Sequence, residues 1–346
     1  MINTIANGVT VRSLQSRLPR LQHMMKNPWQ AQANVFQELI TRGQLTGFGK
    51  DYGVKEAASP EAFSKRLPIL PYEELYPYIE RVLKGETSVL WPGAVNWFAK
   101  SSGTSNDRSK FIPISPDSLK QNHYKAGRDM LALYVNHHPK TSLFVGKSMS
   151  IGGSYTQVPH GGKAQAGDVS AVIVANLPWF YQWKRTPPNH IAFIAEWEKK
   201  VAAMVEAMPK LDVRGLVGIP TWLILLLRDV LEKHPEAQGN IQHIWPHLQV
   251  YFHGAVNFDP YRDQFKQLIP DPNFCYHESY NASEGFFATQ DQYAENSMLL
   301  LTDHGVYYEF VPLSELESEQ PISLTIRDVE VGEHYALVIS TVGGLG

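Results

Sequence analysis

Apolar residues recur at helical spacing through the first 85 residues and change to short β-rich runs beyond residue 90. Near the amino terminus, Leu14, Leu18 and Leu21 repeat every three or four positions, which is the period of one helix face. Asn27 stands directly before Pro28, and a capping side chain followed by proline is typical of a helix start. The first part of the chain is therefore predicted to be helical.

The second part of the chain alternates between short apolar runs and helical segments. Runs rich in β-branched and aromatic residues predict strands at residues 97–99, 111–114, 142–145, 171–174, 213–217, 250–253, 274–276, 299–301, 306–310 and 335–341. The runs at 299–301 and 306–310 flank an Asp-His-Gly turn, which predicts a hairpin. Strands that alternate with helices indicate the α/β class with mixed sheets flanked by helices.

Two of the expected helices carry information about burial. Residues 221–231 are apolar almost all round, so this helix is predicted to be buried. The helix after Pro116 has an apolar stripe, while Tyr124, Arg128 and Leu131 lie on a second, mixed face. Such a face either meets solvent or lines a cleft, and the pattern alone leaves both interpretations open.

Composition limits the classes of protein that this chain can belong to. It has 346 residues, 43% of them hydrophobic, and a formal net charge of −3. No basic field is therefore expected to attract nucleic acid or an anionic membrane, and neither is predicted as a partner. The most apolar stretch, at 216–227, is too short for a membrane span of roughly 20 residues. The single cysteine, Cys275, cannot form an internal disulfide and fits a reducing compartment, so a cytoplasmic location is expected.

A hydroxyl-rich loop lies between the first two predicted strands. Its hydroxyl residues surround one glycine: Ser101, Ser102, Gly103, Thr104 and Ser105, with Lys110 five residues on. Small residues let the backbone approach an anion, and each hydroxyl can donate to a phosphate oxygen. The spacing of a Walker loop is absent. From composition alone, a phosphate loop and a plain serine-rich turn are equally good interpretations.

A second motif follows about 180 residues later, directly after a predicted strand. It consists of Tyr280, Asn281, Ala282, Ser283 and Glu284, followed by glycine. An aromatic ring offers a face for a flat base, and a carboxylate is a preferred ligand of a hard cation. Taken alone, this motif would pass as an ordinary turn with an exposed acid.

In order and separation, the two motifs resemble those of the adenylate-forming superfamily of acyl-CoA ligases and adenylation domains. The resemblance implies that the loop and Lys110 hold phosphates, that Tyr280 and Ser283 lie by the nucleotide, and that Glu284 binds Mg²⁺. Two positions depart from the family pattern, because Asn106 and Asn281 stand where glycine is usual.

Within that superfamily, nearly the whole chain resembles the GH3 family of acyl-acid amido synthetases. Besides the motifs, the segments that carry the likeness are residues 158–168, 218–222 and 252–261, where Gly254-Ala255 replaces a usual Gly-Gly. The resemblance implies that ATP activates a carboxylic acid as an acyl-adenylate and that an amino acid then takes the acyl group. The residues implied for the acid are Arg128, Tyr124, Ile219, Thr221 and Trp222.

The resemblance also implies a domain organisation. Family members continue for more than a hundred residues, so residues 1–346 are expected to form the large amino-terminal adenylation domain, with a helical lead-in at 1–85 and an α/β body at 86–346. The mobile carboxy-terminal domain would be missing, and we expect little full turnover from this chain. The oligomeric state and the particular acid are not predicted.

Specific residues leave two alternative functions open and disfavour others. Coenzyme A could replace the amine as acceptor, because the first half-reaction is shared. A non-catalytic acyl- or nucleotide-binding protein is the second alternative, although Lys110 and Glu284 are more than a binder needs. A metalloenzyme is disfavoured because the thirteen histidines include no suitably spaced pair with a carboxylate, and a G-x-S-x-G elbow is absent. Cys275 is interpreted as a buried strand residue.

Overall fold

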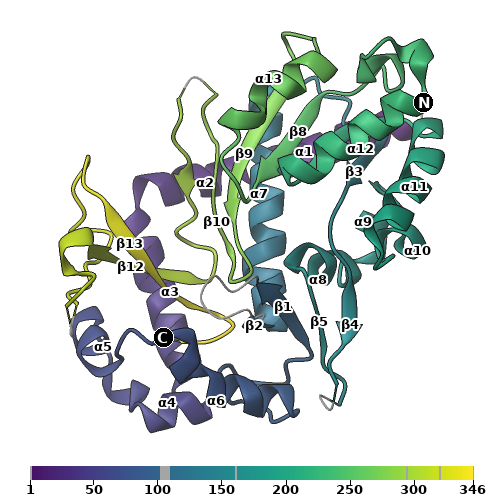
Figure 1. Ribbon diagram of the computed structural model, residues 1–346. Helices are drawn as coiled ribbons and strands as arrows, with labels where there is room; N and C mark the ends of the chain where they lie inside the picture. The colour runs from purple at the N-terminus through teal and green to yellow at the C-terminus, as the bar shows by residue number, and fades with distance from the viewer. Residues whose placement is uncertain (1, 102–109, 160–161, 294, 319–320, 346) are drawn as a thin grey trace.

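The computed structural model describes residues 2–101, 110–159, 162–293, 295–318 and 321–345. These residues form a mixed α/β fold with three sheets (Figure 1), which confirms the predicted class. Among the described residues, no helix is both long enough and apolar enough to cross a bilayer.

Helices alone precede the first strand in the described chain, as predicted. They are α1 (Ile2–Gln15), α2 (Leu18–Lys26), α3 (Pro28–Gly43), α4 (Gly47–Asp51), α5 (Pro60–Arg66) and α6 (Tyr72–Leu83), with a 3-10 turn at Val54–Glu56. Pro28 and Pro60 stand at the starts of α3 and α5, and the Ser59 hydroxyl accepts a hydrogen bond from the backbone N–H of Ala62. Apolar side chains of α3 to α6 pack into one core with Phe98, Tyr307 and Val342.

A seven-stranded sheet forms the centre of the molecule. Its order is β11-β10-β9-β8-β7-β3-β6. The strands are β3 (Lys147–Ser150), β6 (Arg185–Thr186), β7 (Val213–Gly218), β8 (Val250–Gly254), β9 (Cys275–Asn281), β10 (Phe286–Thr289) and β11 (Leu299–Leu300). Strands β6, β3, β7, β8 and β9 are parallel, whereas β10 and β11 join in antiparallel pairs.

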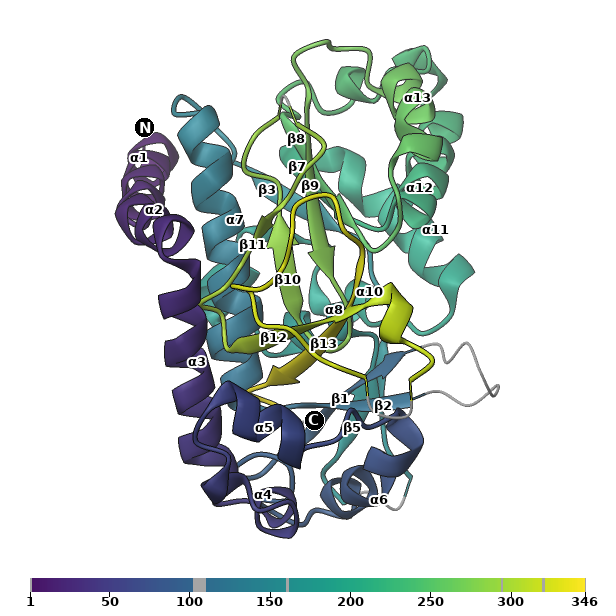
Figure 2. The same cartoon turned by 90° about the vertical axis from the view of Figure 1, so that its left-hand side faces the viewer.

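Helices cover both faces of this sheet (Figures 1 and 2). The helices of the second part are α7 (Tyr124–His137), α8 (Val169–Ala175), α9 (Trp179–Gln182), α10 (Asn189–Ala192), α11 (Trp197–Ala207), α12 (Pro220–Lys233) and α13 (Asp259–Leu268). Val250 and Phe252 pack with α1, α2 and α7, whereas Tyr251 packs with α11, α12 and α13. This alternation follows from the two-residue period of a strand. Helix α12 is buried only on its core side, and Leu225 on its other side is 48% exposed, so the predicted burial holds for one side of the helix.

Two smaller sheets complete the fold. Strands β1 (Trp97–Ser101), β2 (Lys110–Ile114), β4 (Tyr155–Gln157) and β5 (Gln165–Gly167) form a sheet of order β2-β1-β5-β4, and β12 (Val306–Pro312) pairs with β13 (Tyr335–Thr341). A π-helical turn at Ser118–His123 leads into α7, and 3-10 turns lie at Met208–Lys210, Pro235–Ala237, Ile241–His243 and Leu313–Glu315.

Several predicted elements are wrong. The valine-rich run at 171–174 is helical, within α8, and residues 142–145 form turns rather than a strand. The runs at 299–301 and 306–310 do not pair with each other, because β11 joins β10 and β12 joins β13. Strand preference depends on what a segment packs against, and the Val172 side chain packs on Ala99 of β1 in the helical form.

Candidate active site

Strands β1 and β2 hold the two ends of the hydroxyl-rich loop. Ser101, the last residue of β1, is the cross-strand partner of Lys110, the first residue of β2. Antiparallel pairing therefore fixes the ends of the loop as neighbours. The loop residues Ser102, Gly103, Thr104 and Ser105 lie outside the described residues, and their contacts to phosphate stay predictions.

The Lys110 side chain lies against helix α6. Its ammonium is 3.8 Å from a carboxylate oxygen of Glu73 and 5.1 Å from the centre of the Tyr72 ring. The Tyr72 hydroxyl accepts a 2.7 Å hydrogen bond from the backbone N–H of Phe111. A partly exposed ion pair at this distance contributes little to stability, so Lys110 can turn toward an anion at small cost.

A cavity of about 350 Å³ lies beside Ser101, between β1 and the β4–β5 hairpin. Its lining is mostly polar and comprises Lys100, Ser101, Ser154, Tyr155, Thr156, Ala166, Gly167 and Asp168. Residues 158–168 carry a family likeness to which no chemical role was assigned, and Ala166, Gly167 and Asp168 form one wall of this cavity.

The second motif forms the turn between β9 and β10. Asn281 pairs with Phe286, and the backbone N–H of Ala282 donates a 2.8 Å hydrogen bond to the Gly285 carbonyl. This short turn leaves the Glu284 side chain exposed and that of Ser283 half-buried. Tyr280 is 45% exposed, which leaves part of its ring open to a flat ligand.

Gly254 ends β8 directly beside the same turn. A Cβ atom at this position would lie 2.3 Å from the backbone oxygen of Ser279, so only glycine permits the approach of β8 to β9. The next residue, Ala255, has a φ of 69°. Positive φ costs a residue with a Cβ roughly 1 to 2 kcal/mol, which explains why glycine is the usual residue there.

Asn122 joins the start of α7 to the second motif, and sequence analysis missed it. Its Oδ1 accepts a 2.6 Å hydrogen bond from the backbone N–H of Phe286, and its Nδ2 donates to the carbonyls of Phe286 and His304, each at 3.0 Å. The side chain is buried. Its position between Leu119 and Ala126, on the apolar stripe, is the signal that could have revealed it, because a buried amide needs partners.

Tyr124 and Arg128 lie on α7, close to the foot of the loop. The Tyr124 ring packs in one cluster with Ala99 and Val172. Its hydroxyl is buried without a described hydrogen-bond partner, and burial raises its pKa to about 12. Arg128 Nε donates a 3.2 Å hydrogen bond to the Tyr124 carbonyl. The mixed face of this helix is therefore partly buried against β1 and α8.

The residues implied for the acid at 219–222 follow the carboxyl end of β7. Ile219, Thr221 and Trp222 are half-buried, and the Trp222 ring lies 5.3 Å from that of Trp197. Gly218 is the cross-strand partner of His253. Residues 219–222 therefore begin at the same end of the central sheet as Gly254.

The 218–222 segment and the second motif both lie at carboxyl ends of strands in the central sheet. The carboxyl ends of β7, β8 and β9 lie in register there, with Gly218, His253 and Glu278 side by side. In both orientations, β1 and β2 lie at the end of the sheet where β9 turns into β10 (Figures 1 and 2). Ligand sites of open α/β sheets lie beyond such carboxyl ends.

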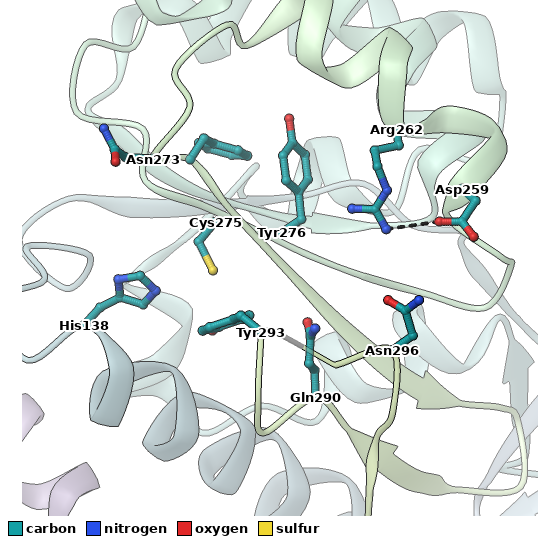
Figure 3. Close-up of a pocket in the computed structure, with 10 residues that line it drawn as sticks. His138, Asp259, Arg262, Asn273, Cys275, Tyr276, Gln290, Tyr293 and Asn296 are labelled. Atoms are coloured by element: carbon teal, nitrogen blue, oxygen red, sulfur yellow. Dashed lines mark hydrogen bonds and ion pairs between the residues drawn. The ribbon is translucent and has the colours of Figure 1, made fainter.

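Figure 3 shows a different cavity, along β9 near its amino end, with a volume of about 490 Å³. Its lining residues are His138, Asp259, Arg262, Asn273, Phe274, Cys275, Tyr276, Gln290, Tyr293 and Asn296. Burial raises the pKa of the Cys275 thiol to about 11, which fits a buried strand residue and not a nucleophile. Residues implied for nucleotide or acid are not among its lining.

Comparison with solved structures shows which known fold this chain has. It is similar to the GH3.15 acyl acid amido synthetase, with a TM-score of 0.76 and 18% identity over 96% of this chain and 66% of that one. It is also similar to 2-hydroxyisobutyryl-CoA ligase in complex with R3-HIB-AMP, with a TM-score of 0.52 and 11% identity over 90% of this chain and 59% of that one. The fold is that of the large domain of adenylate-forming enzymes.

The family follows from the sequence comparisons. Residues 17–274 match the GH3 family N-terminal domain, and residues 299–346 match the GH3 family central domain. The chain belongs to the GH3 family, because the first match alone covers well over half of its length.

Two plant relatives match along almost the whole chain. The indole-3-acetic acid-amido synthetase GH3.3 of Arabidopsis thaliana is 23% identical over 94% of this chain and 64% of its own length. The corresponding synthetase GH3.8 of Oryza sativa subsp. indica is 24% identical over 99% of this chain and 66% of its own length. The chain thus spans about two thirds of the length of these relatives.

Proposed function

We propose that this chain provides the carboxylate-activating site of an ATP-dependent acyl-acid amido synthetase. A carboxylate oxygen would attack the α-phosphorus of ATP, the bond to the bridging oxygen would break, and pyrophosphate would leave. An amino acid nitrogen would then attack the acyl carbon, and AMP would leave with the bonding electrons. Relatives named for indole-3-acetic acid and jasmonate amide synthesis support this reaction class.

One observation carries the proposal. The turn at 282–285, the start of α7 and the base of the loop are tied together by Asn122 and by the cluster around Tyr124. An activating enzyme needs phosphate, metal and carboxylate contacts within a few ångström of one another, because positioning supplies much of the rate. These contacts support such proximity in the proposed site.

Each group has a role that its surroundings permit. Ser101 and Lys110 at the two ends of the loop would hold phosphate oxygens. Tyr280 would stack beside the base, with Ser283 near the α-phosphate. Arg128 would orient the acid and Tyr124 would donate its free hydroxyl, while residues 219–222 would form a wall of the acyl pocket.

The implied cofactors are ATP and Mg²⁺, and Glu284 would be the protein's metal ligand. Mg²⁺ keeps several waters and takes substrate phosphates, so one or two carboxylates suffice. A single exposed carboxylate at the turn fits that demand, and among the described residues no group of three possible ligands is gathered elsewhere. The reducing compartment expected from Cys275 makes the cytoplasm the proposed location.

The test is a hydroxamate trap of the acyl-adenylate. The chain, ATP-Mg²⁺ and one acid at a time from a panel that includes indole-3-acetate and 2,4-DB would be incubated with hydroxylamine. We expect acyl-hydroxamate with at least one acid and a loss of at least about 100-fold with Glu284→Ala. Glu232→Ala, an exposed acid on α12, should behave as the parent.

The same variants separate the alternatives. If Glu284→Ala binds ATP-Mg²⁺ as tightly as the parent and the parent forms no hydroxamate, the chain is a binder. Acyl-CoA in place of amide, from coenzyme A and an amino acid mixture offered together, would identify a CoA ligase.

A further inference from the structure

Helix α9 and the residue after it present a cluster of exposed aromatic rings, here called the aromatic surface. Trp179 and Trp183 are each 79% exposed, Phe180 is 51% exposed and Tyr181 is 39% exposed. Large rings have the most apolar area to remove from water, and contiguous exposed apolar patches mark interaction sites. In Figure 1, α9 lies at the outside of the molecule beside α10.

The side chain of Gln182, within the same turn, points into the protein and fixes the orientation of the aromatic surface. Gln182 Nε2 donates hydrogen bonds to the carbonyls of Val174 at 3.0 Å and Leu177 at 3.3 Å. Trp179 and Trp183 are four residues apart and so share one side of a helical turn. The fold thus fixes the turn with its polar side inward and its two tryptophans toward water.

Three cations lie beside the aromatic surface. The acids that border this segment in the chain are Asp168 and Glu196, and Glu196 is paired with Lys199 at 2.7 Å. Lys147 Nζ donates a 2.9 Å hydrogen bond to the Trp183 carbonyl, and Lys184 and Arg185 follow directly in the chain. Residues 169–195 contain no aspartate or glutamate. The nearby carboxylate of Asp212 is paired at 2.9 Å with Arg214, so it does not offset these cations.

We propose that the aromatic surface docks on the headgroup region of a lipid bilayer that contains anionic lipids. Tryptophan and tyrosine favour this region because one end of each ring system is apolar and the other polar. Each lysine or arginine near an anionic surface adds attraction. The docking is peripheral, through rings and cations together.

A second copy of the chain fits the aromatic surface less well. Complete burial of its four rings would cover on the order of 600 Å², whereas each partner of a stable interface contributes roughly 800 Å². The clustered cations would also face one another across a symmetric contact. The net charge of −3 opposes attraction of the whole chain to an anionic bilayer. Salt screens charges farther than about 10 Å from the bilayer, so the cations beside the aromatic surface contribute most once that surface is close to the lipid.

Flotation with vesicles tests the proposal on the whole chain. We expect binding to phosphatidylcholine vesicles that contain phosphatidylglycerol and much weaker binding to pure phosphatidylcholine. The double variant Trp179→Ala, Trp183→Ala should bind about tenfold more weakly or worse, and Lys184→Gln about fivefold more weakly. Trp29→Ala, which removes a 46% exposed ring on α3, is the matched control and should bind as the parent.

Three results would overturn the proposal. The first is absence of binding to anionic vesicles. The second is binding that the double variant leaves unchanged while its melting temperature equals that of the parent. The third is a dimer in light scattering that the double variant abolishes, because a second copy would then be the occupant.

Discussion

Two adjacent side chains at the start of α7 bury polar atoms without described partners. Neither ring nitrogen of His123 has one, and burial lowers the pKa of this histidine to about 4, so it is neutral near pH 7. The Tyr124 hydroxyl is likewise unpaired. Each such group costs about 1 to 3 kcal/mol, and groups of this kind persist where a ligand completes them.

Tyr124→Phe should therefore separate stability from binding. Removal of the unpaired hydroxyl should raise the free energy of unfolding by about 1 kcal/mol. The affinity of the chain for the free carboxylic acid should fall about tenfold. Urea unfolding measures the first effect and calorimetry with the acid the second. In the control Tyr134→Phe, stability should fall, because the Tyr134 hydroxyl lies 3.2 Å from Thr141 Oγ1 in a hydrogen bond. A Tyr124→Phe chain that loses stability and keeps its affinity would contradict the assignment.

At the scale of elements, a buried charge network joins α2 to α7. The Asp129 carboxylate is fully buried and accepts hydrogen bonds from Arg17 Nε at 2.5 Å, from Arg20 and from His304 Nε2 at 2.8 Å. Because Asp129 follows Arg128 in the chain, the network fixes the rotation of the helix that carries the site. The start of α2 thus helps to position the helix that carries Tyr124 and Arg128.

The network predicts an acid-sensitive fold. Burial alone would raise the pKa of Asp129, but hydrogen bonds from His304 and Arg17 lower it from 3.8 to about 2. A lowered pKa stabilises the fold above the unfolded value, so the contribution of roughly 2 kcal/mol is complete above about pH 4 and lost as the pH falls toward 2. Urea unfolding across that range should show the loss.

Asp129→Asn should remove this loss of stability at low pH. It should cost about 3 kcal/mol at pH 7, because the partly exposed Arg17 and Arg20 lose their buried counter-charge. Glu206→Gln is the control. Hydrogen bonds from Lys233 and Lys210 lower the pKa of Glu206 to about 2 as well, but this carboxylate is solvent-exposed, so solvent screens its pairs. Equal effects of the two substitutions would argue against a special role for the buried network.

The elements that the sequence predicted well are those with a strong local pattern. Strands β8 and β13 carry runs of apolar or β-branched residues, β7 carries such residues around one arginine, and α12 has an apolar run of helical length. Strand β3 was missed because Lys-Ser-Met-Ser lacks such a run, although it pairs between β7 and β6. Short polar strands gain their stability from neighbours that no local window contains.

At the scale of the molecule, the proposed nucleotide and acid sites share one edge of the central sheet. Ligands that occupy adjacent sites on one edge should stabilise the fold together, and each alone stabilises it according to its concentration over Kd, by about 2.7 kcal/mol at a hundredfold excess. The rise in melting temperature with ATP-Mg²⁺ and an acid together should exceed the sum of the separate rises. Scanning fluorimetry measures all four conditions.

Glu284→Ala provides the control for this coupling. It should keep the rise caused by the acid and lose most of the rise caused by ATP-Mg²⁺. Strictly additive rises in the parent would place the two ligands on independent surfaces and contradict a shared site.

The sequence by itself determined the class of fold and singled out the candidate site residues, because strand runs, proline-marked helix starts and the two motifs are local patterns. Tertiary structure decided the contacts between segments that lie far apart in the sequence. It paired β12 with β13 instead of β11, made residues 169–175 helical against β1, and placed Asn122 against the turn that carries Glu284. Contacts between distant segments depend on packing and hydrogen-bond partners of the whole chain, and these have no signature within one short stretch.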